Sequence, residues 1–279
     1  RYARTVPREG GTGIMVGAEA RRLGPEHGRV GIVLIHGYLG GSNNFGTLPE
    51  RLADEGWGVY AMRLPGHGTS PLDLREVDLT DYRAAVSEAL DDMKGRYQQV
   101  FIVGHSMGGA LSVLAAAEKE VAGLVLLAPY FGVTHRWYYM LHPETWARLT
   151  SNWLRWLYKP RALVRLNRVE TRDEVVSYPW VPMRSAMVLI ALGREARREE
   201  VLDRVQCPVL LVHSRKDGAA SPLAAAKALD VMGSAVKQAV WLQRSDHIVC
   251  WDYERERVIE EVAGFVRELA GENGLGGLM

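Results

Sequence analysis

Short apolar runs rich in β-branched residues alternate with stretches of helical periodicity along most of this chain. Such alternation predicts a parallel sheet, because each parallel connection has to cross back over the sheet and usually does so as a helix. We therefore predict an α/β fold with a mostly parallel central sheet and helices on both faces. The predicted strands are residues 30–35, 58–62, 100–103, 123–127, 209–212 and 238–242. The predicted helices are residues 45–55, 82–93, 107–118, 222–229 and 254–269.

The alternation stops between residues 132 and 205, where we predict no strand and where aromatic residues gather. Trp146, Leu149 and Trp153, followed by Trp156 or Leu157, have a three-four spacing, which predicts a helix with an apolar stripe. We expect these aromatics either to pack the segment onto the core or to line an apolar pocket and contact a lipid surface. The predicted parts are a core of residues 1–131 and 206–270, an inserted helical cap at 132–205 that includes a return helix, and a flexible tail at 271–279.

The charge balance, the length of the apolar runs and the cysteine count each argue against a class of partner or site. The chain has 279 residues with 34 basic and 33 acidic side chains, a formal net charge of +1, so nucleic acid is not expected as a partner. No apolar run approaches the length of a transmembrane helix. Only two cysteines, Cys207 and Cys250, are present, which excludes a multi-cysteine metal site and leaves one disulfide open.

The segment Gly104-His105-Ser106-Met107-Gly108 matches the G-x-S-x-G pattern of a nucleophile elbow. A predicted strand precedes it and a predicted helix follows at once, which is the context the pattern requires. A serine on such a turn is exposed above the sheet, and the helix N-terminus directs N–H groups toward developing negative charge. We interpret Ser106 as the nucleophile of an acyl-transfer enzyme.

A serine hydroxyl needs an oriented base, and in this architecture the acid follows the serine and the histidine comes last. Asp217 and His247 each follow a predicted strand, so both are expected at the carboxyl edge of the sheet. We predict that His247 is the base and that Asp217 orients it. Asp246 is the alternative acid, but it is adjacent to the histidine and is expected to point away from it.

Two backbone N–H groups should hold the oxyanion that forms during acyl transfer. We predict the N–H of Met107, after the nucleophile, and that of Tyr38, in the glycine-rich loop after the first predicted strand. No phosphate-binding loop or zinc-binding H-E-x-x-H pattern is present, so no metal is implied. The candidate substrate-binding residues are Leu39, His105, Trp137 and Trp153, and His105 has the alternative of packing locally.

These segments together resemble the α/β-hydrolase superfamily, in particular carboxylesterases and bacterial monoacylglycerol lipases. The matching stretches are 31–41 (GIVLIHGYLGG), 56–70 (GWGVYAMRLPGHGTS), 103–109 (VGHSMGG), 208–217 (PVLLVHSRKD) and 245–258 (SDHIVCWDYERERV). The resemblance implies an α/β-hydrolase fold, a serine-dependent ester hydrolase, no cofactor and a cap over the acyl pocket. The cap is unusually rich in tryptophan and tyrosine, so substrate preference transfers least well.

We therefore expect a serine carboxylesterase that acts on esters with apolar acyl groups, such as short- to medium-chain acyl esters or monoacylglycerols. The alternatives are a thioesterase, a lactonase or a polyester hydrolase with the same triad, or a non-catalytic ligand-binding protein of this fold. We expect a cytoplasmic location, although residue 1 is Arg rather than Met, which leaves a removed leader open. The sequence leaves the oligomeric state open.

Overall fold

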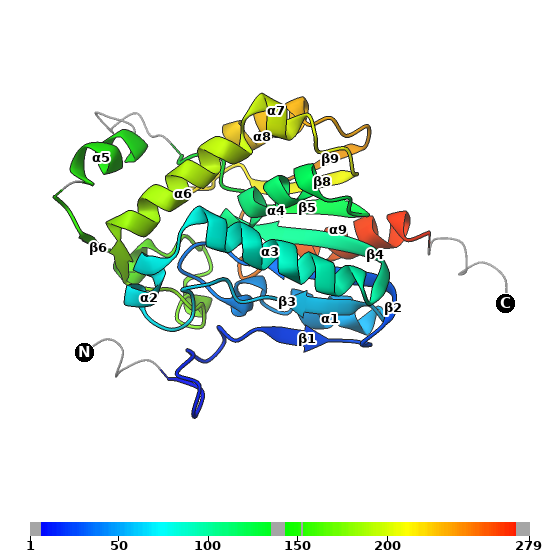
Figure 1. Ribbon diagram of the computed structural model, residues 1–279, viewed down its shortest axis with the longest axis horizontal. Helices are drawn as coiled ribbons and strands as arrows, with labels where there is room; N and C mark the ends of the chain where they lie inside the picture. Colours follow the sequence, from blue (N-terminus) through cyan, green and yellow to red (C-terminus); the bar gives the residue numbers. More distant parts are fainter. Residues whose placement is uncertain (1–6, 135–142, 152, 272–279) are drawn as a thin grey trace.

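The computed structural model describes residues 7–134, 143–151 and 153–271, and its centre is a seven-stranded sheet (Figure 1). The strand order is β1-β3-β2-β4-β5-β8-β9. All neighbours pair in parallel except β1, which pairs antiparallel with β3 at one edge. The strands are β1 (Arg21–Leu23), β2 (Gly28–Ile35), β3 (Gly58–Ala61), β4 (Tyr97–His105), β5 (Gly123–Leu127), β8 (Val209–Ser214) and β9 (Lys237–Leu242).

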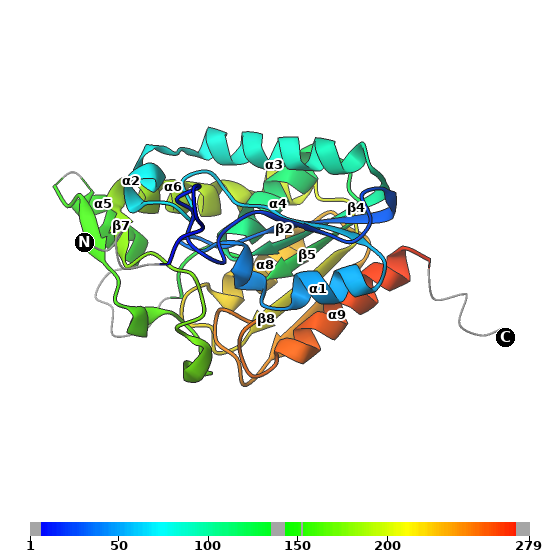
Figure 2. The same ribbon diagram turned by 90° about the horizontal axis from the view of Figure 1, so that it is seen from below.

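Helices cover both faces of the sheet because neighbouring residues of its central strands point in opposite directions. Within β4, Val100 and Ile102 pack in one hydrophobic cluster, and Phe101 and Val103 pack in the other. Figure 2 shows the two layers on either side of the strands. The first cluster includes residues of α3 (Leu79–Lys94), α4 (Met107–Glu118), α6 (Met183–Ala196), α7 (Glu199–Leu202) and α8 (Pro222–Val231). The second includes residues of α1 (Leu48–Asp54) and α9 (Arg255–Leu269).

The predicted fold class is confirmed, and each of the six predicted strands and five predicted helices has a counterpart. The largest difference in length is in β4, which begins at Tyr97 and runs to His105 because it pairs with β2 and β5 on both sides. The sequence reading missed three short elements of the core. They are the edge strand β1, the 3-10 helix η2 (Ser42–Phe45) and α2 (Pro71–Glu76).

The prediction that residues 132–205 contain no strand is wrong. β6 (Trp156–Tyr158) and β7 (Trp180–Pro182) form a separate two-stranded antiparallel sheet. The predicted helix through Trp146, Leu149, Trp153 and Trp156 is only partly right, because α5 (Pro143–Thr150) contains Trp146 and Leu149 but ends before Trp153. Aromatic and branched residues suit both periods, and here pairing with β7, including contact of the Tyr158 and Trp180 rings, selects the strand.

We call residues 132–205 the cap segment. Its described part adds no strand to the seven-stranded sheet, and α5 lies beyond the end of the sheet in both views (Figures 1 and 2). Besides α5, β6, β7, α6 and α7, its described elements are the 3-10 helices η3 (Arg161–Leu163) and η4 (Val169–Thr171). The division into core and inserted cap stays a prediction. Trp137 and all of the expected flexible tail but Gly271 lie outside the described residues. Within the described ranges, no helix is long and apolar enough to span a membrane.

Candidate active site

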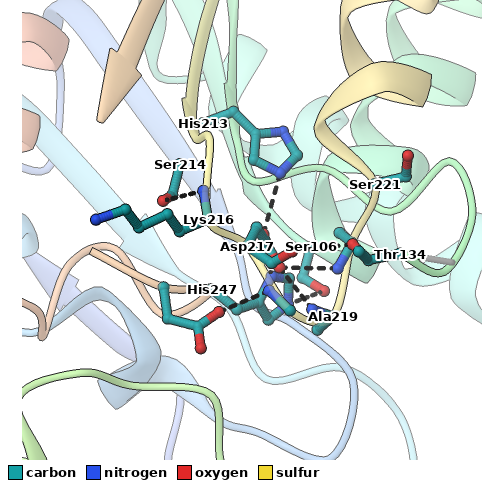
Figure 3. A network of polar contacts seen from close by, with 12 residues as sticks. Ser106, Thr134, His213, Ser214, Lys216, Asp217, Ala219, Ser221 and His247 are labelled. Atoms are coloured by element: carbon teal, nitrogen blue, oxygen red, sulfur yellow. Dashed lines mark hydrogen bonds and ion pairs between the residues drawn. The ribbon is translucent and has the colours of Figure 1, made fainter. Parts of the chain in front are cut away.

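Three side chains meet where three strands of the sheet end. Ser106 follows β4, Asp217 follows β8 and His247 follows β9, so the order of the sheet brings together residues 141 positions apart. Nε2 of His247 lies 2.8 Å from Oγ of Ser106, and its Nδ1 lies 2.8 Å from Oδ2 of Asp217 (Figure 3). The structure therefore brings together the predicted nucleophile, base and acid in one hydrogen-bonded line.

Ser106 is held in a backbone conformation that non-glycine residues rarely adopt, with φ 55° and ψ −115°. Close packing around the turn maintains it. A Cβ at Gly104 would lie 2.5 Å from the carbonyl oxygen of Gly108, and a Cβ at Gly108 would lie 1.9 Å from the carbonyl oxygen of Ile35. Only glycine fits at both positions, so strand and helix approach closely and the serine is left at the apex of the turn.

Asp217 is almost fully buried, at 2% exposure, and its carboxylate is surrounded by donors. Oδ1 accepts hydrogen bonds from the N–H groups of Ala219 and Ala220, at 2.7 and 2.9 Å. Oδ2 faces His247 and also Nε2 of His213, at 3.0 Å. Burial acts to raise the pKa of Asp217, but the charge and hydrogen bonds of the two histidines outweigh it and hold the pKa below its usual range. The carboxylate thus stays ionised beside His247.

His213 is a further residue of the site, beside Asp217. It is fully buried at the end of β8, and its ring stacks on Trp241. Since Asp217 already accepts from His247, the N–H of His213 is a second fixed donor to the same oxygen. His213 therefore holds the carboxylate in place.

Asp246, the alternative acid, does not face the imidazole of His247. Its Oδ1 accepts a hydrogen bond from the N–H of Gly218 at 2.8 Å, so it braces the loop that contains Asp217. The adjacent loop is held by Asp252 and Glu254. Asp252 accepts from the N–H of Asp246 at 2.7 Å, and Glu254 accepts from three successive N–H groups, those of Gln243, Arg244 and Ser245.

The loop after β2 lies against the nucleophile. A Cβ at Gly37 would lie 3.1 Å from Cβ of Ser106. Nδ1 of the buried His36 lies 2.9 Å from the carbonyl oxygen of Gly37, and its Nε2 accepts from the N–H of Leu64. Burial and the nearby His67 lower the pKa of His36 well below its ordinary value, so the ring is neutral and can accept that bond. His36 thus fixes the start of the loop.

The predicted oxyanion donors lie at this loop and at the start of α4. Within the described residues, neither the N–H of Tyr38 nor that of Met107 has a hydrogen-bond partner. The Tyr38 hydroxyl is hydrogen-bonded to Oγ of Ser185 on α6, which connects the loop to the cap segment. Two unpaired backbone donors beside Ser106 match the arrangement that stabilises a tetrahedral intermediate.

A cavity of about 370 Å³ opens above Ser106 and His247, a usual size for a small-molecule site. Its described lining is mainly apolar or aromatic and includes Tyr38, Tyr130, Leu163, Val175, Leu189 and Ile248. Of the four predicted substrate-binding residues, His105 lines it, with its ring against that of His247. Leu39 is buried in a neighbouring cluster, Trp153 is 71% exposed and not part of the described lining, and Trp137 lies outside the described residues.

The sequence reading missed several lining residues because no motif marks them. Asn44 directly precedes a predicted helix, and its Oδ1 accepts from the N–H of Gly37. Lys159 and Arg165 lie in the segment where no strand was predicted and where the predicted helix was too long. In the described ranges, no group of three or more histidine, cysteine, aspartate or glutamate side chains could hold a metal ion, and Cys207 and Cys250 are free thiols.

A mostly parallel sheet with a serine on a strained strand-to-helix turn, and with a histidine and an aspartate at the next strand ends, defines an α/β-hydrolase. The comparisons with known proteins agree. The chain belongs to the family described as serine aminopeptidase, S33, whose model matches residues 26–254. It is an enzyme, a serine hydrolase similar to esterases and lipases.

The individual relatives cover nearly the whole chain. The chain is 29% identical over 249 residues to a thermostable monoacylglycerol lipase of Bacillus sp. (strain H-257), covering 88% of this chain and 94% of that protein. It is 22% identical over 240 residues to a carboxylesterase of Bacillus subtilis (strain 168), covering 85% and 92%. A solved structure from a study of two metagenome-derived lipolytic enzymes has a TM-score of 0.79 at 26% identity, covering 91% of this chain and 99% of the other.

Proposed function

We propose that this protein is a serine carboxylesterase that hydrolyses carboxylic esters with apolar acyl groups, such as short- to medium-chain acyl esters or monoacylglycerols. The observation that supports it most is the line from Ser106 through His247 to Asp217 at the floor of a largely apolar cavity. The relatives named monoacylglycerol lipase and carboxylesterase support the same class of substrate.

In the proposed mechanism, Nε2 of His247 takes the proton of Ser106 as the oxygen attacks the ester carbonyl. The negative charge that develops on the carbonyl oxygen is held by the N–H groups of Tyr38 and Met107. His247 then gives the proton to the leaving alcohol, which breaks the ester bond and leaves an acyl-enzyme on Ser106. Water, deprotonated by His247, releases the acid. Asp217 keeps Nδ1 protonated and stabilises the imidazolium throughout.

The family description names an aminopeptidase, and the charge of the cavity argues against that activity. An aminopeptidase has to bind the positively charged α-amino group of its substrate, which needs a carboxylate partner. Within the described lining there is no aspartate or glutamate, whereas Lys159 and Arg165 are both present. A cationic substrate would meet repulsion there, so an ester fits better than a peptide.

We also propose that the cap segment makes transient contact with lipid surfaces. Trp146, Trp153, Tyr158 and Trp180 are all at least 43% exposed, although aromatic side chains usually bury most of their surface. Tryptophan and tyrosine favour the boundary between water and lipid, since one end is apolar and the other polar. A cytoplasmic location is proposed as well, and the free thiols Cys207 and Cys250 are compatible with a reducing compartment.

The decisive test combines labelling and hydrolysis. A fluorophosphonate should label the folded wild type at Ser106, and the protein should hydrolyse 4-nitrophenyl butyrate and monobutyrylglycerol. Ser106→Ala should abolish labelling and lower kcat about 10⁵-fold or more, because the nucleophile is removed. Ser112→Ala is the matched control, since Ser112 is a buried serine of α4, the helix that follows Ser106, and its hydroxyl donates to the carbonyl of Gly108.

Several outcomes would contradict the proposal. Wild type that is folded but neither labelled nor active would indicate a non-catalytic ligand-binding protein. Faster turnover of butyryl thioesters or lactones than of matched oxygen esters would indicate a thioesterase or lactonase. Release of soluble acids from polyester films, without activity on monomeric esters, would indicate a polyester hydrolase.

A further inference from the structure

Two cationic side chains line the cavity that contains Ser106. Lys159 follows β6 and Arg165 follows η3, so both come from the cap segment. The guanidinium of Arg165 lies over Gly218, where a Cβ would be 3.2 Å from its Cζ, and Gly218 is adjacent to Asp217. The backbone carbonyl of Arg165 accepts the N–H of Ile248, next to His247. The two cations are thus part of the wall around the reacting groups.

Neither cation is neutralised. Across residues 7–134, 143–151 and 153–271, neither the Lys159 ammonium nor the Arg165 guanidinium forms an ion pair or a side-chain hydrogen bond. Asp246 is close enough for the charge of Arg165 to affect it, although burial is the larger influence and raises its pKa. Its Oδ1 is held by the N–H of Gly218, and it does not line the cavity in the described part of the chain.

The stretches of the cap segment outside the described residues add no carboxylate. Residues 135–142 and 152, which adjoin the described cap segment, include no aspartate or glutamate. The one acidic side chain outside the described residues is Glu272. In the sequence it follows Gly271, two residues past the last residue of α9, and α9 lies at the opposite end of the molecule from α5 and β6 (Figure 1).

Placing two like charges together in a partly buried wall is unfavourable unless an anion joins them. The effect is visible at Lys159, where burial and the charge of Arg165 lower the pKa to about 8. At pH 7 the ammonium is still mostly protonated, so both charges are present. By contrast Arg161, the first residue of η3, is exposed and pairs with Asp173 at 3.0 Å. The cap segment can therefore supply partners for its cations, and those in the cavity lack them.

We propose that Lys159 and Arg165 form an anion subsite, and that the preferred substrates are esters that also carry a carboxylate or phosphate group. This rests on the proposed function, since the same Ser106 hydrolyses the ester bond. The apolar lining takes the hydrocarbon part of the substrate, and the two cations bind the anionic group. Each charge-assisted hydrogen bond to the anion should contribute about tenfold to kcat/KM.

The test compares matched pairs of neutral and anionic esters. Charge on the acyl side is tested with mono-4-nitrophenyl adipate against 4-nitrophenyl hexanoate. Charge on the alcohol side is tested with 4-carboxyphenyl hexanoate against its methyl ester. The wild type should prefer the anionic member of at least one pair at low ionic strength, and the pair concerned shows which part of the substrate meets the cations.

Lys159→Met and Arg165→Gln should each reduce the anionic-to-neutral ratio of kcat/KM about tenfold, and Lys159→Arg should retain most of it. Arg148→Gln is the control, because it removes an exposed cap charge outside the described lining. Thermal unfolding checks that each variant is folded. If neutral esters are hydrolysed but no variant changes the ratio, the subsite is wrong and the esterase proposal stands. If no ester of either kind is hydrolysed, both proposals fail.

Discussion

The carboxyl edge of the central sheet and the cap segment border the same cavity, but they are held together differently. At the sheet edge, Ser106, Asp217 and His247 are placed by the register of β4, β8 and β9. In the described part of the cap segment, the only sheet is the short pair β6 and β7, and side chains form many of the hydrogen bonds to the backbone. Arg161 donates to the carbonyl oxygens of Arg172, Asp173 and Val175.

The same kind of support ties the cap segment to the core. The side-chain amide of Asn43 bonds the cap backbone twice: its Nδ2 donates to the carbonyl oxygen of Glu174, and its Oδ1 accepts from the N–H of Val176. The hydroxyl of Tyr178 donates to the carbonyl of Gly66 and accepts from the N–H of Thr69. Irregular backbone has to find partners for its polar groups, and here polar side chains provide them. The reacting groups are therefore positioned by a regular framework, whereas the cap walls of the cavity depend on individual side chains.

The largest expected effect tests the framework. Asp217→Asn should lower kcat about 10⁴-fold, because an amide cannot hold His247 in the tautomer that accepts the serine proton. The same substitution at Asp246 should cost less than about tenfold, since Asp246 bonds the N–H of Gly218 and not the imidazole. Steady-state kinetics on 4-nitrophenyl butyrate measures both. Equal losses of kcat in the two variants would mean that the position of Asp217 after β8 does not identify it as the acid partner of His247.

That framework is also the part that could be predicted from the sequence. The strands before Ser106, Asp217 and His247 read as buried parallel strands, and the sheet then brings their ends together. Gly104 and Gly108 of the elbow pattern indicate a turn that only glycine permits. What could not be read was how far each strand extends, as at β4, because pairing partners determine strand ends.

The cap segment could not be predicted because individual side-chain contacts, and not a regular sheet, support its backbone. Trp146, Leu149 and Trp153 have helical spacing, yet α5 ends at Thr150, whose hydroxyl bonds the carbonyl of Trp146. Apolar periodicity reports packing of one face, and Trp146 and Trp153 are 49% and 71% exposed. Lys159 and Arg165 enter the cavity through loop geometry, which leaves no periodic signal.

A second prediction tests the connection between the two regions. Asp252 is fully buried, and its carboxylate accepts hydrogen bonds from four backbone N–H groups. Two of them belong to the cap segment, at Asn167 and Arg168. The other two lie near His247 in the core, at Asp246 and Tyr253. Asp252→Asn replaces one acceptor with a donor that faces these groups. We expect a loss of about 3 kcal/mol in the free energy of unfolding and a lower kcat.

Urea unfolding measures this effect, and Asp173→Asn is its control. Asp173 also lies in the cap segment, but its side chain is 90% exposed and it pairs with Arg161 on the surface. Its substitution should change stability by about 0.5 kcal/mol or less. If Asp252→Asn were as mild, the cap segment would not depend on individual buried side chains.

A third prediction concerns the effect of acid on the region near the sheet edge. Buried His67 lies beside His36 in the core, whereas the described cap segment has no histidine. Burial lowers the pKa of His67 to about 4, and an unfolded chain has a value of about 6.5. Between these values the unfolded state binds the proton and the folded state does not. Stability therefore falls as the pH falls from 6.5 to about 4.

From pH 7 to pH 4.5, His67 should account for a loss of about 2 kcal/mol in the free energy of unfolding. His67→Gln should remove that part of the pH dependence in urea titrations at the two pH values. His27→Gln, at an exposed position of the core, should leave the dependence as in the wild type. An unchanged slope in His67→Gln would show that this histidine is not the acid-sensitive group.

The smallest effect on stability and on kcat/KM is expected at Trp153, an exposed residue of the cap segment. Its side chain is 71% exposed and lies outside the described lining of the cavity, so little packing is lost on truncation. Trp153→Ala should change stability by about 0.5 kcal/mol or less and kcat/KM for a dissolved ester by less than about twofold. If the exposed aromatics contact lipid, the same variant should lose several-fold in rate on an emulsified monoacylglycerol, because a tryptophan at the lipid boundary contributes both area and a polar contact. An equal effect on the rates with dissolved and emulsified substrate would mean that Trp153 does not contact lipid. A large loss of stability would mean that the cap is packed more like the core than the exposure of Trp153 indicates.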